Sequence, residues 1–388
     1  SKYDKGYGHF STRQNLQLNW PTLESTPDIL AELATVEMHA IQTSGNCIRN
    51  ITTDQFAGIA PDEVIDPRAM AEIMRQWSTF HPELCFLPRK FKVALTGTPE
   101  DRALVQIHDM AFEVVEAAPH AVFRVRVGGG LGRTPILGPV LCERLDWFDL
   151  LTYTHAVMRV YNELGRRDNL TKARIKILVR SVGIEKFREM VDAEWQDLRH
   201  GPHKLAQAEL ERVQSAFIEP DWTHGQVLVT LARSGSAGDP TQWQRWLKRN
   251  RLAHRQPGYA AILIPLKAPG RAPGDVTSSE MDAIAEIADR FSQGFVRVSH
   301  TQDFVLPAVR EADLPDLYEA LKGLNLHHAV GGLIGAMVAC PGGDFCALAN
   351  ARSLPIADDI AQRFAANGEA IQYFHLHDQA LVDRDEPF

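Results

Sequence analysis

The most constraining feature of this sequence is an internal repeat. Residues 10–33 align without a gap on residues 298–321, and six positions carry the same residue in both copies. Each copy has the pattern of a strand, a polar turn, a second strand and a helix that begins at Pro-Asp. Two short copies far apart predict a duplicated α/β half rather than a solenoid, and a ligand site at the interface between the halves. Coincidence between two ordinary strand-turn-helix units is the less favoured alternative.

The remaining pattern mixes strands and helices, which indicates an α+β architecture. Residues 199–258 have a weaker pattern, and the Gly- and Ser-rich stretch Arg233–Pro240 has the composition of a linker. We expect a helix from Thr26 to Gly45, strands at Phe91–Thr96, Leu104–Val115, Val122–Val127 and Tyr259–Leu266, and helices at Trp147–Leu164 and Ile184–Trp195.

Composition limits the possible functions. The chain has 388 residues, enough for two or three domains, and a net charge of -8, which argues against a nucleic-acid partner. It has no apolar run of 18 residues and no signal-like start, so we expect no membrane partner. Its five scattered cysteines predict no disulfide framework and favour a reducing cytoplasm.

Basic residues gather in the first half, around Arg13, around Arg49, and in the run Arg166–Lys176. Lys90 and Lys92 flank a phenylalanine at strand spacing, so both ammonium groups project from one face. Like charges on one face indicate either a bound anion or a solvated strand face, and spacing alone favours the solvated face.

Two further motifs have ordinary explanations when taken singly. The stretch Val127–Pro135 is glycine-rich and follows a predicted strand, which suits a backbone that approaches an anionic ligand, but also a plain hairpin. Cys340 and Cys346 flank a Pro-Gly-Gly turn that could bring two thiolates to one iron–sulfur cluster, or they could be two core cysteines.

Together and in order, these motifs resemble the signatures of siroheme-dependent sulfite and nitrite reductases. The resemblance covers residues 1 to about 366, including the repeat. It is carried by five motifs: His9–Gln17, Arg49–Asn50, Leu87–Lys92, Gly128–Arg133, and Cys340–Gly342 with Cys346–Ser353.

The resemblance implies a pseudo-two-fold α+β fold, with two ferredoxin-like elements that each feed a larger mixed α/β cofactor-binding domain. It implies ferredoxin-like halves at 1–58 and 257–329, a siroheme- and substrate-binding domain at 59–232, a linker at 233–256 and a partial iron–sulfur domain at 330–388. It also implies six-electron reduction of sulfite to sulfide in sulfur assimilation, at a siroheme coupled to a [4Fe-4S] cluster.

The family motifs also imply roles for single residues. Arg13, Arg49, Lys90 and Lys92 would bind the substrate anion, and Cys340 and Cys346 would be the first two cluster ligands. The cofactor-binding residues would be Gln14, Asn50, Arg89, Gly129, Gly130, Gly132, Arg133, Arg174, Lys176 and Gln302. Electrons would come from ferredoxin or a flavoprotein reductase.

The sequence departs from the family pattern in one respect. Family members carry a second cysteine pair, downstream of the first, and its last thiolate bridges cluster and siroheme, but no such pair follows Cys346 here. If these residues were the whole polypeptide, we would expect a poorly assembled cofactor and little activity. The missing pair makes a non-catalytic remnant one alternative. Within the family, nitrite reduction and, less favoured, a related role in corrin synthesis are the others.

Overall fold

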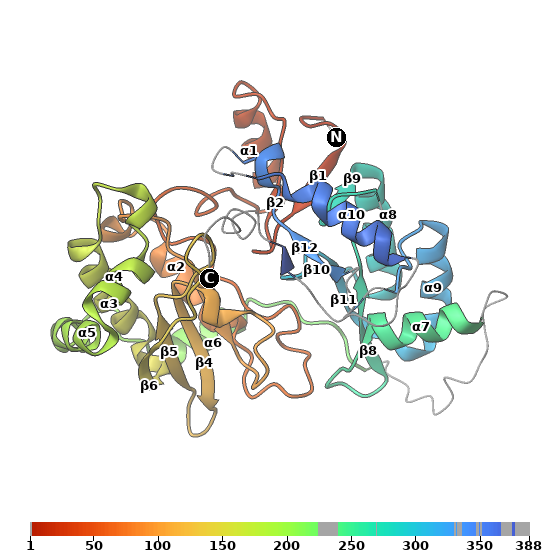
Figure 1. Ribbon diagram of the computed structural model, residues 1–388. Helices are drawn as coiled ribbons and strands as arrows, with labels where there is room; N and C mark the ends of the chain where they lie inside the picture. Colours follow the sequence, from red (N-terminus) through yellow and green to blue (C-terminus); the bar gives the residue numbers. More distant parts are fainter. Residues whose placement is uncertain are drawn as a thin grey trace. The chain divides into compact units, whose positions relative to one another are not determined.

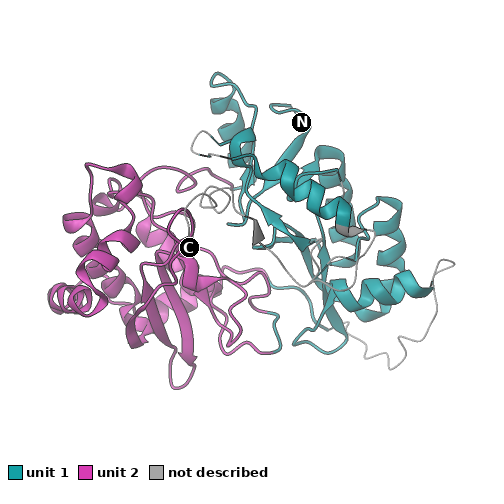
Figure 2. Ribbon diagram, in the orientation of Figure 1, with its two compact units in different colours: residues 1–37, 59–61, 219–388 teal, residues 38–58, 62–218 magenta. Residues whose placement is uncertain are grey.

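The structure is a computed structural model that describes residues 2–223, 240–268, 270–329, 331, 336–346, 349, 351–365 and 375–376. Its contacts divide the chain into two compact units, shown in Figure 2. Unit 1 comprises residues 1–37, 59–61 and 219–388, and unit 2 comprises residues 38–58 and 62–218. The ferredoxin-like half expected at residues 1–58 is divided after residue 37, and residues 38–58 pack with unit 2.

The described part of unit 1 contains three small sheets. The first is antiparallel, in the order β2 (Leu16–Gln17), β1 (Tyr7–Phe10) and β9 (Asp275–Thr277). The second is also antiparallel, in the order β10 (Arg297–Val298), β11 (Phe304–Arg310), β8 (Tyr259–Ile264) and β7 (Arg251–Leu252). The third pairs β12 (Val338–Ala339) with β13 (His375–Leu376) in parallel.

Helices accompany these sheets, and Figure 1 shows α7 and α9 close to β8 and β11. Trp246 of α7 and Tyr318 of α9 are at most 2% exposed and lie in one core cluster with strand β8. The helices and short 3-10 turns of this unit are α1 (Thr26–Ala34), α7 (Pro240–Asn250), α8 (Ser278–Phe291), η5 (Glu311–Asp313), α9 (Leu314–Gly323), η7 (Gly342–Asp344) and α10 (Ser353–Ala365).

Unit 2 is built on one four-stranded sheet in the order β3 (Val93–Thr96), β4 (Met110–Glu116), β5 (Val122–Val127) and β6 (Val140–Asp146). The first pair is parallel and the other two are antiparallel. Figure 1 shows helices α3, α4 and α5 gathered beside this sheet. Its helices and 3-10 turns are α2 (Arg68–Ser78), η1 (Pro82–Leu84), η2 (Val105–Ile107), η3 (Trp147–Asp149), α3 (Leu150–Leu164), η4 (Leu170–Lys172), α4 (Ile175–Val182), α5 (Ile184–Leu198) and α6 (Gln207–Gln214).

Several predicted elements differ from the observed ones. The first helix ends at Ala34 rather than Gly45, because Glu37 has a φ of 58°, which an α-helix cannot accommodate. The strand expected from Leu104 begins at Met110, because Leu104 is left-handed (φ 51°) and a 3-10 turn follows it. The weakly patterned region contains α7, whose buried tryptophans anchor it as a helix rather than a linker. The glycine- and serine-rich stretch lies, up to Asp239, outside the described residues.

The internal repeat forms two matching turns, which we call the first repeat turn (Ser11–Asn15) and the second repeat turn (Ser299–Asp303). In the first, the Ser11 hydroxyl accepts two backbone N–H groups at 3.3 Å. In the second, the Ser299 hydroxyl accepts the two equivalent N–H groups at 3.2 and 3.0 Å. Gln14 and Gln302 hold φ angles of 59° and 60° at matching positions. The prediction of a duplicated half is confirmed at the level of backbone conformation.

The two repeat turns also contact each other reciprocally. Gln14 Nε2 donates to the carbonyl of Val298 at 2.9 Å, and Gln302 Nε2 donates to the carbonyl of Phe10 at 3.2 Å. Val298 is the repeat equivalent of Phe10, so each glutamine binds the same position of the other copy. Such exchange of equivalent contacts is the mark of a pseudo-two-fold axis between the turns.

Among the described residues, no helix combines the length and the apolar character needed to cross a bilayer.

Candidate functional site

Two neighbouring segments of unit 2 place three predicted anion-binding residues on one face. The backbone around Arg49 runs parallel to residues 90–92, which we call the lysine segment. Arg49 N donates to Phe91 O at 2.8 Å. Ile48 and Phe91 form the bridge between them and are 1% and 0% exposed, so they face the core. Because side chains alternate along extended backbone, Arg49, Lys90 and Lys92 project to the opposite face. The strand expected at Phe91–Thr96 begins at Val93, and Phe91 forms an isolated bridge to Ile48 instead.

Four cations of unit 2 interact electrostatically, and we call them the cationic cluster: Arg49, Arg89, Lys90 and Arg174. Burial lowers the pKa of Lys90, and Arg174, Arg49 and Arg89 lower it further, whereas Asp109 opposes them. Burial also lowers the pKa of Arg49, with Arg89 and Arg174 adding to that effect. Four partly buried cations with one carboxylate leave an excess of positive charge, which an anionic ligand would neutralise.

Asp109 connects the pieces of this site and is itself 0% exposed. Its Oδ1 accepts from Arg174 Nε at 2.8 Å and from Arg174 Nη2 at 2.7 Å. Its Oδ2 accepts from Lys92 N at 2.9 Å, and its backbone carbonyl accepts from Gly128 N at 2.8 Å. The carboxylate of Asp109 therefore fixes the backbone at Lys92 and the start of α4, and its backbone carbonyl fixes the glycine-rich loop.

The glycine-rich loop needs its glycines for space and for conformation. Gly128 and Gly132 have φ angles of 79° and 102°, a region that favours glycine. A Cβ on Gly129 would lie 2.3 Å from a backbone oxygen, and one on Gly130 would lie 3.0 Å from Arg174 Nη2. The loop thus passes directly against one member of the cationic cluster.

Lys176 binds two backbone carbonyls of the glycine-rich loop. Its Nζ donates to Leu131 O at 2.8 Å and to Thr134 O at 2.7 Å. Burial, with a smaller contribution from Arg174, lowers the pKa of Lys176 to about 8. With two donors already engaged by the loop, the geometry favours a supporting role over the predicted direct contact with a cofactor.

A cavity of about 360 Å³ adjoins the glycine-rich loop. Its lining is mainly apolar, with two cationic side chains among it. Such a wall suits a ligand that is apolar in part and also carries carboxylates. The apolar side chains of this wall include Ile136, Val179 and Ile184, and the two cations are Lys176 and Arg180.

In unit 1, Cys340 and Cys346 flank a tight turn at the start of helix α10. Gly342 has a φ of 58°, and Cys346 N donates to its carbonyl at 2.9 Å. Ser353 Oγ donates to Cys340 O at 2.6 Å and lies 3.7 Å from Cys340 Sγ. Cys340 is half-buried and Cys346 is exposed. Cys340 thus lies beside Ser353, the first residue of α10.

Gln302 supports this turn rather than facing a ligand. It is 1% exposed, and its Nε2 donates to Phe10 O and Pro273 O, both at 3.2 Å. Its Oε1 accepts from Ala339 N at 3.0 Å, one residue before Cys340. Because these bonds engage both ends of the amide, the geometry favours a positioning contact, and the contact with a cofactor stays a prediction.

The predicted site residues fall in both units. In unit 2 the structure brings Arg49, Arg89, Lys90 and Arg174 together. Of the other cofactor-binding candidates in that unit, Asn50 is half-buried and Arg133 is exposed. Arg13, Gln14, Gln302 and both candidate cluster cysteines belong to unit 1. The roles given to all of them remain predictions.

Sequence reasoning missed two supporting residues, Asp109 and Ser353. Asp109 immediately precedes strand β4, where an acidic residue normally indicates a turn, so nothing marks it as buried. Ser353 lay within a family motif, but its hydrogen bond to Cys340 depends on tertiary structure.

Two family descriptions match this chain. "Nitrite and sulphite reductase 4Fe-4S domain" matches residues 44–198. "Nitrite/Sulfite reductase ferredoxin-like half domain" matches residues 1–36 and 254–324, the regions that hold the two copies of the repeat.

Curated relatives match nearly the whole chain. Sulfite reductase [ferredoxin] 1 of Mycolicibacterium paratuberculosis is 28% identical over 94% of this chain and 59% of its own length. The chloroplastic ferredoxin–nitrite reductase of Arabidopsis thaliana is 26% identical over 92% of this chain and 57% of its own. The ferredoxin–nitrite reductase of Synechococcus elongatus is 26% identical over 95% of this chain and 65% of its own length. This chain therefore spans about three-fifths of the length of these relatives.

A solved structure has the same fold. The Mycobacterium tuberculosis NirA protein matches with a TM-score of 0.74 at 24% sequence identity, over 97% of this chain and 63% of that one. The predicted α+β fold with ferredoxin-like halves is confirmed.

Proposed function

This chain belongs to the nitrite and sulfite reductase family, and on that premise we propose that it reduces sulfite to sulfide at a siroheme coupled to a [4Fe-4S] cluster. The reaction takes six electrons and six protons and releases three water molecules from bisulfite. The observation that carries the proposal is the cationic cluster, which lies within the residues that match the family's 4Fe-4S domain.

The chemical types of the side chains in unit 2 suit a siroheme. Its carboxylates would bind Arg89, Arg174 and the glycine-rich loop, because fixed guanidinium groups and close backbone suit carboxylate oxygens. The apolar cavity beside the loop suits the edge of a macrocycle.

A cluster fits less completely within these 388 residues. Cys340 and Cys346 provide two of the four thiolates that a [4Fe-4S] cluster takes. Cys47, Cys85 and Cys142 all belong to unit 2. When bound, siroheme and cluster would pass electrons from the donor to the substrate and provide the site where it binds.

The chain's own residues would bind and protonate the anion. Arg49 offers a rigid guanidinium that its own loop holds through Thr43 O at 2.7 Å and Gly45 O at 3.1 Å. Lys90 offers a mobile ammonium, and the described residues give it no hydrogen bond or ion pair of its own. Because its pKa is lowered, Lys90 gives up a proton more readily, which favours the loss of oxygen from the anion as water.

Nitrite reduction is the second candidate, supported by the plant and cyanobacterial relatives. The same cations suit either anion, so the substrate must be decided by turnover. We propose ferredoxin as the electron donor, since the relatives are named for it, with a flavoprotein reductase as the alternative. Five free cysteines favour a reducing, cytoplasmic location.

The test compares steady-state turnover of sulfite and nitrite by the full natural polypeptide, supplied with reduced ferredoxin. Lys90→Met should lower kcat/KM for the physiological anion by about 10²-fold, because a charged donor beside the reacting oxygens is lost. Lys186→Met is the matched control, since Lys186 is exposed and pairs only with Glu189.

Three outcomes are informative. Faster turnover of sulfite with a specific loss in Lys90→Met supports the proposal. Faster turnover of nitrite would make nitrite the physiological substrate, bound at the same cationic cluster. Wild-type activity in Lys90→Met, or no turnover of either anion by a cofactor-loaded chain, overturns it.

A further inference from the structure

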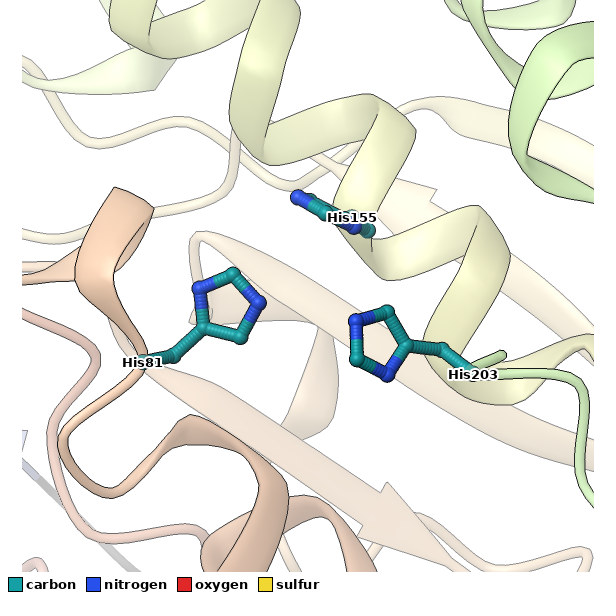
Figure 3. A group of neighbouring side chains, drawn as sticks. All are labelled: His81, His155 and His203. Atoms are coloured by element: carbon teal, nitrogen blue, oxygen red, sulfur yellow. The ribbon is translucent and has the colours of Figure 1, made fainter. Parts of the chain in front are cut away.

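Unit 2 holds a group of three histidines outside the cationic cluster. His81 precedes the short turn η1, His155 lies in the middle of α3, and His203 follows α5. One ligand nitrogen from each lies within 4.8 Å of the others. Figure 3 shows the three rings turned toward one another from three separate segments. No other group of three such side chains occurs among the residues that the structure describes.

The hydrogen bonds of His155 leave one ring nitrogen ready to bind a metal. His155 is 3% exposed, and its Nε2 lies 2.9 Å from Glu83 Oε2. Glu83 is held in turn by Arg159 Nε and Nη2, both at 2.8 Å, and this pair lowers the pKa of Glu83 to about 2. Because a carboxylate accepts, Nε2 is the donor of this hydrogen bond, and Nδ1 of the neutral ring has the lone pair that a metal would bind.

That Nδ1 atom is buried and has no hydrogen-bond partner in the described part of the chain. A buried polar atom without a partner costs stability. A histidine that donates one ring N–H to a carboxylate while the other nitrogen stays open has the arrangement found at metal ligands.

The other two histidines are also suited to bind a metal. Burial lowers the pKa of His81 and of His203, and the nearness of His155 lowers both further, which favours the neutral rings that a metal binds. His203 is held in place by its neighbours, because Lys204 Nζ binds Asp149 at 2.7 Å and Leu205 N donates to Phe148 O at 2.9 Å.

We propose that His81, His155 and His203 form a binding site for a divalent zinc-class ion, separate from the reductase cofactors. Imidazole is a favoured ligand of Zn²⁺, and three histidines leave the fourth tetrahedral position to water. Zn–N bonds of about 2.05 Å place tetrahedral ligand nitrogens roughly 3.3 Å apart, so the rings need to close by only about 1.5 Å. Binding through His81 Nε2 would place the ring proton on Nδ1, which would then no longer accept from Glu83 N at 3.3 Å.

The ion would join the end of α2, helix α3 and the segment after α5. Trp77 packs over all three rings, at centroid distances of 5.2, 5.8 and 5.9 Å. Its indole therefore shields one side of the site and reports on the rings beneath it. The competing explanation is that neutral histidines simply pack against this tryptophan.

The test is a titration of the full chain with Co²⁺ as a spectroscopic probe and with Zn²⁺ in competition. The protein carries no affinity tag and is first stripped with a chelator. Cys340→Ser/Cys346→Ser is the background, so that thiolates of the turn do not contribute. We expect one Co²⁺ per chain, with visible bands of nitrogen and oxygen ligands and no thiolate charge-transfer band, and a Tm that rises with Zn²⁺.

His203→Ala should weaken binding by at least about 100-fold and abolish the rise in Tm, because a direct ligand is lost. His200→Ala is the control, since His200 is exposed and only three residues away. Trp fluorescence and far-UV circular dichroism check that His203→Ala is folded. Equal binding by His203→Ala and the background protein, or no binding of Co²⁺ below millimolar concentration, overturns the proposal.

Discussion

At the scale of single residues, Asp109 links the parts of the candidate site, because it binds both Arg174 and the backbone of Lys92. It is the one carboxylate among the interactions of the cationic cluster, and it is fully buried. Removal of one partner from a buried charge pair leaves the other charge uncompensated, which costs more than the pair itself contributes. The arrangement of Arg174 and the backbone of Lys92 should therefore depend on the charge of Asp109.

Asp109→Asn should lower the free energy of unfolding by about 3 kcal/mol, because Arg174 loses its carboxylate and the cluster gains net positive charge. Urea unfolding of the chain measures this. Asp168→Asn is the matched control, since its pair with Arg166 is exposed and should change stability by less than about 0.5 kcal/mol. Equal losses in both variants would contradict the assignment.

His254 should make stability depend on pH. Burial lowers its pKa to about 4, so the folded chain keeps it neutral where the unfolded chain protonates it. Its Nδ1 accepts from Gln256 N at 2.8 Å. Between about pH 6.5 and pH 4 the unfolded state binds more protons, so the free energy of unfolding falls as the pH falls.

His254→Asn keeps an acceptor for Gln256 N and removes the titration. We expect the loss of stability between pH 7 and pH 5 to be smaller in this variant than in wild type, measured by urea unfolding at each pH. His200→Ala, at an exposed position, should keep the wild-type slope. Identical slopes in His254→Asn and wild type would show that His254 does not titrate as described.

At the scale of elements, the sequence predicted best where one local pattern determines the structure. Strand β5 matches its predicted bounds, because inward Phe123, Val125 and Val127 alternate with polar residues. The helix at Thr26 began as expected but ended early, since it has no buried residue and therefore no core face to extend. Helix α7 was missed because its composition is polar, and only the tertiary structure shows that Trp243 and Trp246 anchor it.

The two repeat turns contribute differently to stability although their backbones match. Gln14 makes one hydrogen bond across the pseudo-two-fold, whereas Gln302 is buried and also holds Ala339 N beside Cys340. Gln302→Ala should therefore cost about 2 kcal/mol, since buried backbone groups lose their partners. Gln14→Ala, the control at the equivalent position, should cost about 1 kcal/mol.

Thermal unfolding of the two glutamine variants gives this comparison, and thiol reactivity of Cys340 adds a local readout. Cys340 should react faster with a thiol reagent in Gln302→Ala than in Gln14→Ala, because Ala339 is released. Equal reactivity in both variants would argue that Gln302 does not position the cysteine turn.

At the scale of the whole molecule, the order of the motifs predicted the family and the fold, while the domain boundaries differed. Residues 38–58 pack with unit 2 because their backbone pairs with the lysine segment, a contact that sequence spacing does not reveal. Asp109, Ser353 and the three histidines became visible only when distant segments met. The chain spans about three-fifths of its relatives, so the activity of the whole protein remains a proposal.

The central claim is that this chain holds a siroheme against the cationic cluster of unit 2. The most direct measurement is the visible absorption spectrum of the full polypeptide, purified without oxygen from cells that make siroheme, with iron counted in the same sample. We expect siroheme bands that are lost in Arg174→Met and kept in Lys186→Met. A folded but colourless protein, or bands that Arg174→Met leaves unchanged, would contradict it.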